Sequence, residues 1–428
     1  TLKKAVPGLE YCLEDARFYP EGNMLAGVLG FTGVDNQGLS GIEYFADKML
    51  KGTAIPVNTI RDSRGKLILF DDRAVKTQPD SMVYLTMDVQ MQGLAERILK
   101  TDLEEFQAKR AIALAMDVQT GEILVAAVAA SSKNNLNEKN YVTSYLFEPG
   151  SIFKTVSFGF LIEKGLYNAS AKVNTEKPVT LLGHSIKDVH TYPSLTQLEV
   201  FTKSSNIGTV RLTGKANRND FYKFLIHCGF GKKTGIEWAT EENGVLREPK
   251  NWSGLSQASL SIGQEIMVTP VQIVRYYAAV ANGGVAVRPA LVSHYFSDNK
   301  VTKLKTSSER VMSEDTAETL IKMLAATVDT GTGKRARTGM LNIGGKTGTA
   351  QIIDQKTKTY SKTNYIASFA GIFPVENPKV AMIVIYENPR SSIYGGDTSA
   401  RTFRKIAEQV AFFYDIGGDS TRIQYANK

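Results

Sequence analysis

The sequence predicts an α/β (α+β) protein with one central, largely antiparallel sheet layered with helices, and a smaller, β-rich N-terminal module. Apolar, strand-like runs lie near both ends of residues 81–428, with helical patterns between them. Residues 1–80 instead hold short apolar runs among many glycines. A chain of 428 residues is long enough for two such units. We therefore expect a domain boundary near residue 80.

The predicted elements of residues 81–428 follow from hydrophobic spacing. A helix is expected over residues 94–99, and Asp117–Gly121 has the composition of a hairpin turn between two strands. The last helix carries an apolar stripe from Phe403 to Phe413. Strands are predicted at four apolar runs, namely residues 111–116, 123–128, 366–373 and 380–386.

Composition argues against several functional classes. The net charge of +8 comes from scattered lysines mixed with acids, which favours a general attraction to anionic membrane or wall polymers over nucleic-acid binding. The four histidines show no zinc-binding spacing, and we expect neither a metal nor a cofactor. Cys12 and Cys228 are expected to be unpaired, buried thiols. No run reaches the ~18–20 apolar residues that span a bilayer.

The most informative feature is an ordered trio of short motifs. Ser151 precedes Lys154 by three residues, Ser204 precedes Asn206 by two, and residues 346–348 read Lys-Thr-Gly. Each motif has decoys elsewhere: Ser-x-x-Lys recurs at Ser63 and Ser297, Ser-x-Asn at residues 132 and 297, and Lys-Thr-Gly at Lys233. Those three named decoys lie in polar or glycine-rich segments that indicate loops. Context therefore favours the trio over its decoys.

Ser151 has the surroundings that a nucleophile needs. A Pro-Gly turn signal precedes it and an apolar helical pattern follows it, which places it in the first turn of a buried helix. Free backbone N–H groups and the helix dipole favour negative charge there. Lys154 lies one turn later on the same face, so its amine can take the hydroxyl proton if burial disfavours the charged form. By itself, the motif more often marks a helix-capping serine with a surface lysine.

The other two motifs supply polar groups around a cleft. Ser204 and Asn206 fit a short loop between helices, from which the hydroxyl relays a proton and the amide holds a substrate peptide group. By itself, the pair is more often a capping serine and a turn asparagine. Small residues around Lys346 predict an edge strand against which a substrate backbone lies. Lys346 would supply a fixed positive charge, and the hydroxyls of Thr347 and Thr349 would hold a carboxylate.

Together these residues resemble the penicillin-recognising serine acyltransferases, whose three-motif signature is well known. The surrounding sequence resembles class B penicillin-binding proteins in particular, over nearly the whole chain. The segments that carry this resemblance are Arg17–Pro20, Gly30–Phe31, Gly41–Glu43, Glu148–Lys154, Lys203–Gly208, Gly229–Ile236, Gly263–Gln264, Val268–Gln272, Ala281–Gly284 and Gly345–Ala350. One departure is Ala400–Arg401, where the family usually has Ala-Pro, so contacts of the last helix are expected to differ.

The resemblance implies a penicillin-binding/transpeptidase fold and a two-step acyl transfer on peptidoglycan. Ser151 would attack the penultimate D-Ala of a stem peptide, with Lys154 as base. Ser204 would pass the proton to the leaving D-Ala, and Asn206 would orient the donor peptide. An amine from a second stem would then form the cross-link, and β-lactams would leave a stable ester on the serine.

The resemblance also implies the remaining roles in the cleft. Backbone N–H groups of Ser151 and Thr349 would form the oxyanion hole. Lys346, Thr347 and Thr349 would hold the terminal carboxylate, with Gly348 letting the substrate lie close to the strand. We expect no metal in this site.

Two alternatives stay open within the family. A D,D-carboxypeptidase or β-lactamase-type hydrolase would need a group that activates water, and the sequence shows none. A non-catalytic penicillin sensor or scaffold would tolerate decay of the motifs, yet all three are intact.

Cellular role and location follow from the resemblance alone. Tyr365–Pro374 is more similar to division-type than to elongation-type proteins. We expect residues 1–80 to be a truncated, non-catalytic pedestal whose membrane anchor is missing, on the extracytoplasmic (periplasmic) face of the membrane. The implied partners are a membrane glycosyltransferase and divisome proteins.

Overall fold

The computed structural model describes residues 16–22, 24–50, 59–64, 67–70, 81–132, 140–238, 240–297, 299–353, 357 and 359–417. At its centre is a five-stranded, fully antiparallel sheet in the order β14-β15-β16-β4-β5. These strands span Gly344–Ile353, Tyr360–Phe373, Val380–Glu387, Arg110–Asp117 and Ile123–Ala130. The four predicted strands are confirmed, and β14, which carries the Lys-Thr-Gly motif, is an edge strand as the sequence predicted.

The β4–β5 hairpin shows why these strands form. Asp117 Oδ1 accepts hydrogen bonds from the backbone N–H groups of Gln119 (2.9 Å) and Thr120 (2.7 Å), and Gly121 turns the chain at φ +80°. Along β4, Ile112 and its alternate neighbours face one core, whereas Ala113 and its alternate neighbours face the other. Both faces of the sheet are therefore buried, which explains the nearly continuous apolar runs.

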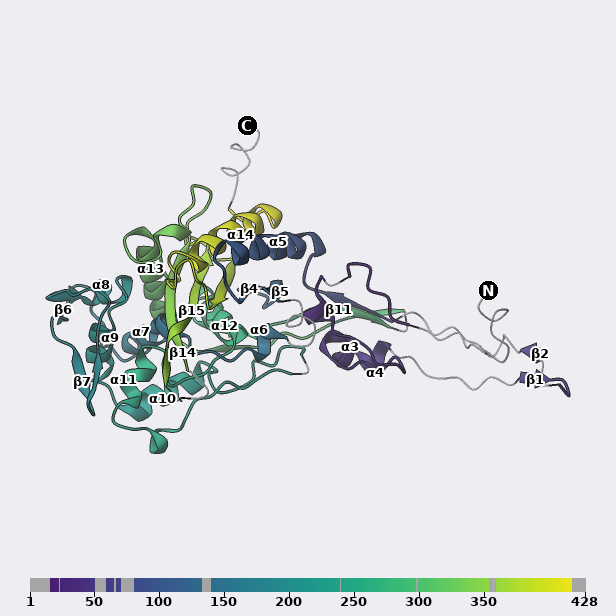
Figure 1. Cartoon of the computed structure of the whole chain (residues 1–428), viewed down its shortest axis with the longest axis horizontal. Coiled ribbons are helices and arrows are strands. Elements are labelled where there is room, and N and C mark those ends of the chain that lie inside the picture. The colour runs from purple at the N-terminus through teal and green to yellow at the C-terminus, as the bar shows by residue number, and fades with distance from the viewer. Residues whose placement is uncertain are drawn as a thin grey trace.

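Helices cover each face of the sheet. α5 (Val89–Glu105) and α14 (Ser399–Phe413) pack together over one face (Figure 1). α12 (Pro270–Ala281) packs against β4, β15 and β16 on the other face, together with α13 (Glu314–Asp329) and α7 (Lys154–Glu163). The predicted final helix is confirmed, and its non-family residue Arg401 pairs with Glu105 at 2.8 Å.

Smaller elements complete the part that contains the sheet. The remaining helices are α6 (Tyr141–Ser144), η3 (Gly150–Phe153), α8 (Gln197–Thr202), α9 (Asn206–Thr213), α10 (Arg218–His227), η4 (Pro249–Asn251), α11 (Ser256–Ser261) and η5 (Lys334–Ala336). The small sheets use β3 (Met82–Leu85), β6 (Lys172–Asn174), β7 (Val179–Leu181), β8 (His184–Ile186), β9 (Ser194–Thr196), β10 (Val285–Val287), β11 (Val292–Ser297), β12 (Lys300–Lys303) and β13 (Ser308–Arg310).

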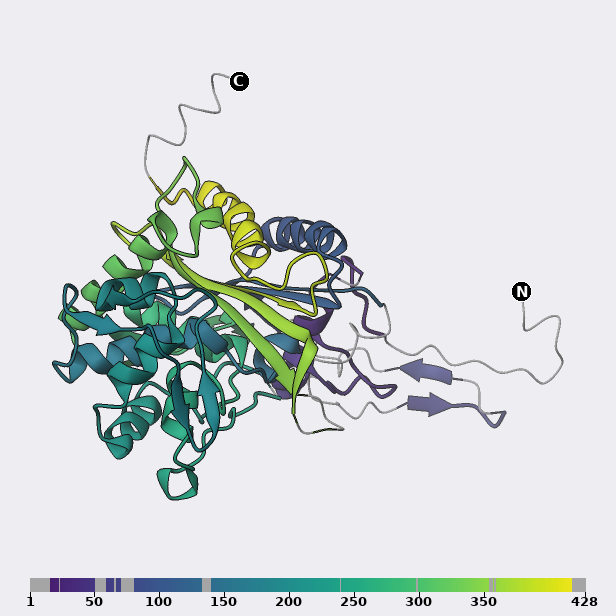
Figure 2. The same cartoon turned by 60° about the vertical axis from the view of Figure 1, so that its left-hand side comes forward.

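The described part of residues 1–80 holds more helix than the sequence predicted. It has three short helices, α2 (Ala26–Leu29), α3 (Gly41–Phe45) and α4 (Asp47–Leu50), beside one strand pair, β1 (Thr59–Arg61) with β2 (Leu67–Phe70). The β1–β2 pair lies apart from the main body in two views (Figures 1 and 2).

A partly exposed ion pair joins two of the three N-terminal segments that carry the family resemblance. Arg17 Nε lies 2.8 Å from Glu43 Oε1. Ile42, next to Glu43, belongs to the same core cluster as Val292 of β11. The short helices therefore pack on the part of the chain that follows residue 80, and the boundary near that residue stays a prediction.

Candidate active site

A cleft of about 700 Å³ lies along the edge strand β14. Six of the eight predicted site residues line it: Ser151, Ser204, Asn206, Thr347, Gly348 and Thr349. The other two, Lys154 and Lys346, are fully buried. Three segments that are far apart in the sequence therefore meet at one cavity, as their order and context predicted.

Ser151 sits in the short η3 turn that leads into the buried helix α7. On its buried side, the turn is held by Gly263, whose carbonyl oxygen accepts a hydrogen bond from the N–H of Gly150 at 2.9 Å. Tyr277 of α12 adds a second bond, donating its hydroxyl to the Ile152 carbonyl at 2.9 Å. The nucleophile segment is thus held by backbone contacts on its buried side, and Ser151 faces the cleft.

The Lys154 amine is held by carbonyl oxygens of the second motif. Its Nζ donates to the Ser204 carbonyl at 2.6 Å and to Asn206 Oδ1 at 2.7 Å, and it lies 3.3 Å from Ser204 Oγ. Burial lowers the pKa of Lys154 to about 7, and the carboxylate of Asp188 opposes that shift. A neutral amine has two N–H donors and one lone pair, so these two acceptors leave the lone pair free to take a proton.

The second motif bridges α8 and α9, as the sequence predicted. Ser204 occupies this connection with φ +61°, a conformation that costs energy for a non-glycine residue. Asn206 begins α9, and its Nδ2 donates to the Lys187 carbonyl at 3.1 Å. The amide of Asn206 is thereby oriented with its oxygen toward Lys154.

Asp188 is a residue of the site that sequence reasoning missed. Its Oδ1 accepts the backbone N–H groups of Asn206 at 2.5 Å and Ile207 at 3.0 Å, and its Oδ2 accepts the Ser205 hydroxyl at 2.5 Å. These are the N–H groups that a helix leaves unpaired at its start, so the carboxylate caps α9. The only sequence signal was an acidic residue among the polar residues between β8 and β9.

The third motif lines the cleft with hydroxyls. Thr347 Oγ1 lies 2.6 Å from Thr332 Oγ1, and Thr349 Oγ1 accepts the N–H of Gly395 at 3.4 Å. A Cβ at Gly348 would lie 2.3 Å from Ser368 Oγ and 3.1 Å from the Pro149 carbonyl oxygen. Only glycine therefore lets β14 lie this close to the nucleophile segment.

Lys346 differs from the fixed charge that the sequence suggested. It is fully buried, with Nζ 3.2 Å from the Thr347 carbonyl oxygen and 5.9 Å from the centre of the Phe201 ring. Burial, and secondly the nearby Lys154, lower the pKa of Lys346 well below its ordinary value. The surroundings of Lys346 thus disfavour its charged form.

The decoy motifs lie elsewhere. Ser63 is in the turn between β1 and β2, Ser297 ends β11, and Lys233 is in a loop after α10. Cys228 is buried and unpaired as predicted, whereas Cys12 lies outside the described residues. Among the described residues, no group of three or more His, Cys, Asp or Glu side chains could hold a metal ion.

The family model for the penicillin binding protein transpeptidase domain matches residues 111–408, which contain all three motifs and the whole cleft. This chain belongs to the penicillin-binding protein transpeptidase family. The chain is 31% identical to the peptidoglycan D,D-transpeptidase FtsI of Escherichia coli K12, over 98% of this chain and 71% of that protein. It is also 31% identical to the stage V sporulation protein D of Bacillus subtilis, over 91% of this chain and 63% of the relative.

Solved structures agree with the sequence relatives. Penicillin-binding protein 3 of Mycobacterium tuberculosis, complexed with aztreonam, superposes with a TM-score of 0.82 at 28% identity and covers 95% of this chain and 92% of its own. The chain is thus a class B penicillin-binding protein of the division type, and the predicted fold class is confirmed. Within the described residues, no helix has the length and hydrophobicity to cross a membrane.

Proposed function

We propose that this protein is a serine peptidoglycan D,D-transpeptidase that cross-links stem peptides through an acyl-enzyme on Ser151. The main support for this proposal is the environment of the Lys154 amine. Its amine is buried, its pKa is about 7, and two carbonyl oxygens take its N–H groups. A base of this kind suits general-base catalysis near neutral pH, which typically contributes about 10²–10⁴-fold in rate.

In the first step, Ser151 Oγ bonds to the carbonyl carbon of the penultimate D-Ala while its proton moves to Lys154 Nζ. Backbone N–H groups of Ser151 and Thr349 stabilise the oxyanion. The bond to the terminal D-Ala nitrogen then breaks, and that nitrogen receives the proton through the Ser204 hydroxyl, which lies 3.3 Å from Lys154 Nζ.

The substrate is held by groups on both sides of the cleft. The terminal carboxylate of the donor, or the carboxylate of a β-lactam, binds Lys346, Thr347 and Thr349, and Gly348 admits the backbone beside β14. Asn206 orients the donor peptide. In the second step, an amine of a neighbouring stem bonds to the acyl carbon, releases Ser151 Oγ, and returns the system to its starting protonation state.

The carboxylates of the cleft favour transfer over hydrolysis. Asp188 and Asp397 are the acidic residues among those that line it. Asp188 is committed to the start of α9, and Asp397 pairs with Arg335 at 3.0 Å. Both carboxylates already have polar partners, which argues against the carboxypeptidase and β-lactamase alternative.

We further propose that the protein works at the extracytoplasmic face of the membrane, in cell division, with a membrane glycosyltransferase and divisome proteins as partners. The division-type relatives support this role. Residues 1–80 would form the non-catalytic pedestal and residues 81–428 the transpeptidase domain. The separate position of β1 and β2 supports such an extension (Figure 1).

Intact mass after incubation with benzylpenicillin, followed over hours, tests the chemistry. We expect a lasting adduct of one drug mass that is absent in Ser151→Ala. Ser63→Ala is the matched control, because Ser63 is the first serine of a decoy Ser-x-x-Lys motif. Labelling of Ser151→Ala would overturn the assignment, and a transient adduct with drug turnover would indicate a hydrolase. Activity on stem peptides separates the enzyme from a sensor.

A further inference from the structure

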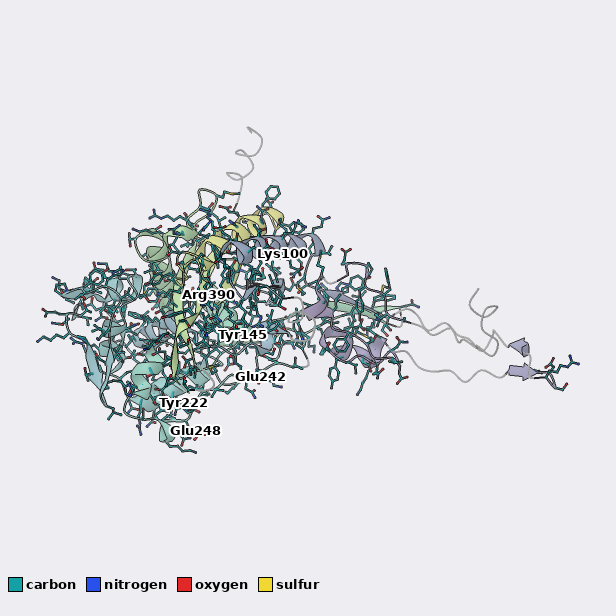
Figure 3. The ribbon with its side chains drawn as sticks, in the orientation of Figure 1. Lys100, Tyr145, Tyr222, Glu242, Glu248 and Arg390 are labelled. Atoms are coloured by element: carbon teal, nitrogen blue, oxygen red, sulfur yellow. The ribbon has the colours of Figure 1, made fainter. Side chains whose placement is uncertain are left out.

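A second pocket, of about 420 Å³, lies between α10 and α12 and shares no lining residue with the catalytic cleft. Tyr222, labelled in Figure 3, lines it from α10. The decoy Lys-Thr-Gly motif contributes Lys233 and Thr234 to its wall. This segment has no part in the proposed acyl transfer, and its composition calls for a separate explanation.

A partly buried guanidinium lines the pocket. Arg275, on α12, has a buried Nε without a hydrogen-bond partner, and none of its nitrogens makes an ion pair with a described residue. Gly229, with φ +93°, admits the group: a Cβ at this position would lie 2.5 Å from Arg275 Nη1. Glu309 and Glu241 favour the charge of this partly buried guanidinium without an ion-pair contact, so an anion that pairs with it directly would be bound favourably.

Most of the charged side chains in the lining are cationic. Lys223, Lys232 and Lys233 join Arg275, whereas Glu309 is the only carboxylate among the lining residues. That carboxylate lies 3.9 Å from His227. Without the histidine, the side chains that line the pocket therefore carry an excess of three positive charges. A ligand with a single carboxylate would leave most of this charge unbalanced.

Buried side chains fix the loop that carries the lysines. Gln272 Nε2 donates to the Lys232 carbonyl at 2.8 Å. Buried Glu241 accepts the N–H groups of Thr234 at 2.5 Å and Gly235 at 3.0 Å. The loop backbone is thus held in place from within the protein, so a ligand would have to order the lysine side chains but not the loop itself.

We propose that this pocket binds a phosphoryl anion, either as a free diphosphate or as the phosphate of a lipid headgroup. Arg275 would pair with two of its oxygens, a geometry that guanidinium and phosphate share. The lysines would balance the remaining charge. The volume lies at the low end of the range for small-ligand sites, which suits a diphosphate-sized group. The proposal does not depend on the acyl transfer.

Titration calorimetry of the whole chain with inorganic pyrophosphate, at low ionic strength, tests the pocket. We expect one site, with affinity reduced at least tenfold in Arg275→Gln and in the double variant Lys232→Gln/Lys233→Gln. The matched control is Lys300→Gln/Lys303→Gln, which removes the same charge from exposed lysines of β12. Benzylpenicillin labelling of each variant verifies folding and is expected to be unchanged, which separates this site from the catalytic one.

Several results would overturn the proposal: no binding of pyrophosphate, equal loss in the control pair, or equal binding of citrate in place of pyrophosphate. Because Lys232 and Lys233 are exposed, their double variant keeps the test valid if Arg275→Gln misfolds. Flotation with vesicles of phosphatidylcholine with and without phosphatidic acid then identifies the source of the phosphate. Vesicle binding that pyrophosphate displaces supports a lipid headgroup, and pyrophosphate binding without vesicle binding supports a free diphosphate.

Discussion

Asp188 and Asn206 are joined at 2.5 Å, where a carboxylate oxygen accepts the first backbone N–H of α9. The Asn206 side chain in turn accepts a hydrogen bond from Lys154 at 2.7 Å. A residue outside the three motifs therefore positions the amide that holds the proposed base. This connection gives the first prediction.

Asp188→Ala should slow acylation by a fluorescent penicillin at least tenfold and destabilise the protein by about 1–2 kcal/mol, because it removes the carboxylate that accepts the first two backbone N–H groups of α9. It should also shift the pH–rate profile to lower pH, since the carboxylate raises the pKa of Lys154. Asp220→Ala is the matched control: Asp220 is an acid in the first turn of α10 whose pair with Lys164 is exposed. If the pH–rate profile of Asp188→Ala is not shifted, Asp188 has a purely structural role and does not affect the pKa of Lys154.

The acylation rate of the unmodified chain should rise with pH and reach half its maximum near pH 7. Below that value Lys154 is protonated and has no lone pair for the Ser151 proton; above it the neutral amine predominates. Stopped-flow acylation between pH 5.5 and 8.5 measures the profile. Lys154→Met should abolish acylation, whereas Lys164→Met, at the exposed C-cap of the same helix, should not. A flat profile across this range would contradict the role of Lys154.

Gly263→Ala should disable the nucleophile turn. A Cβ there would lie 2.1 Å from the Gly150 carbonyl oxygen, and the residue has φ +79°. Gly165→Ala is the control, because Gly165 has φ +65° but no atom within 4 Å of its added Cβ. We expect backbone strain alone to lower the free energy of unfolding of the control by about 1–2 kcal/mol. Overpacking should lower that of Gly263→Ala by about 1–3 kcal/mol more. Denaturant unfolding measures the stability of each variant, and penicillin labelling measures whether Ser151 still reacts. Equal stability and equal labelling of the two variants would refute the role of Gly263 in the nucleophile turn.

Thr332→Val should weaken β-lactam binding without changing the chemical step. Its hydroxyl lies 2.6 Å from Thr347 Oγ1 and orients that group for a carboxylate. Loss of one such hydrogen bond costs about 1 kcal/mol, or roughly fivefold in the dissociation constant that precedes acylation. Thr330→Val is the control, because the Thr330 hydroxyl bonds only its own helix, at the Ala326 carbonyl. A fall in the acylation rate constant at saturating drug would instead show that Thr332 contributes to the acylation step and not only to binding.

Much of the fold was predictable because its elements have strong local signals. The strands of the central sheet are buried on both faces, so β4 and β16 are continuous apolar runs. The helices α2, α3 and α4 have only four or five residues each, too few to show a helical period, and they were not predicted.

The site was predictable where chemistry depends on short spacing, as in Ser151 and Lys154. It was not predictable where contact joins distant segments. Asp188 meets Ser205 across 17 residues and lies between two short strands, with no local spacing to mark it. The low pKa of Lys346 likewise depends on burial and on a neighbour from another motif, which only the folded chain brings together.

The burial of Lys154 and Lys346 near each other has a consequence for ligand recognition. In the empty cleft, burial lowers the pKa of both lysines, and the proximity of Lys154 lowers that of Lys346 further. A carboxylate bound beside Lys346 would raise the pKa of its amine again, so the occupied site holds more protons than the empty one between those two pKa values. Binding of the D-Ala carboxylate is thereby linked to proton uptake, and the heat of binding should vary with the ionisation enthalpy of the buffer in that pH range.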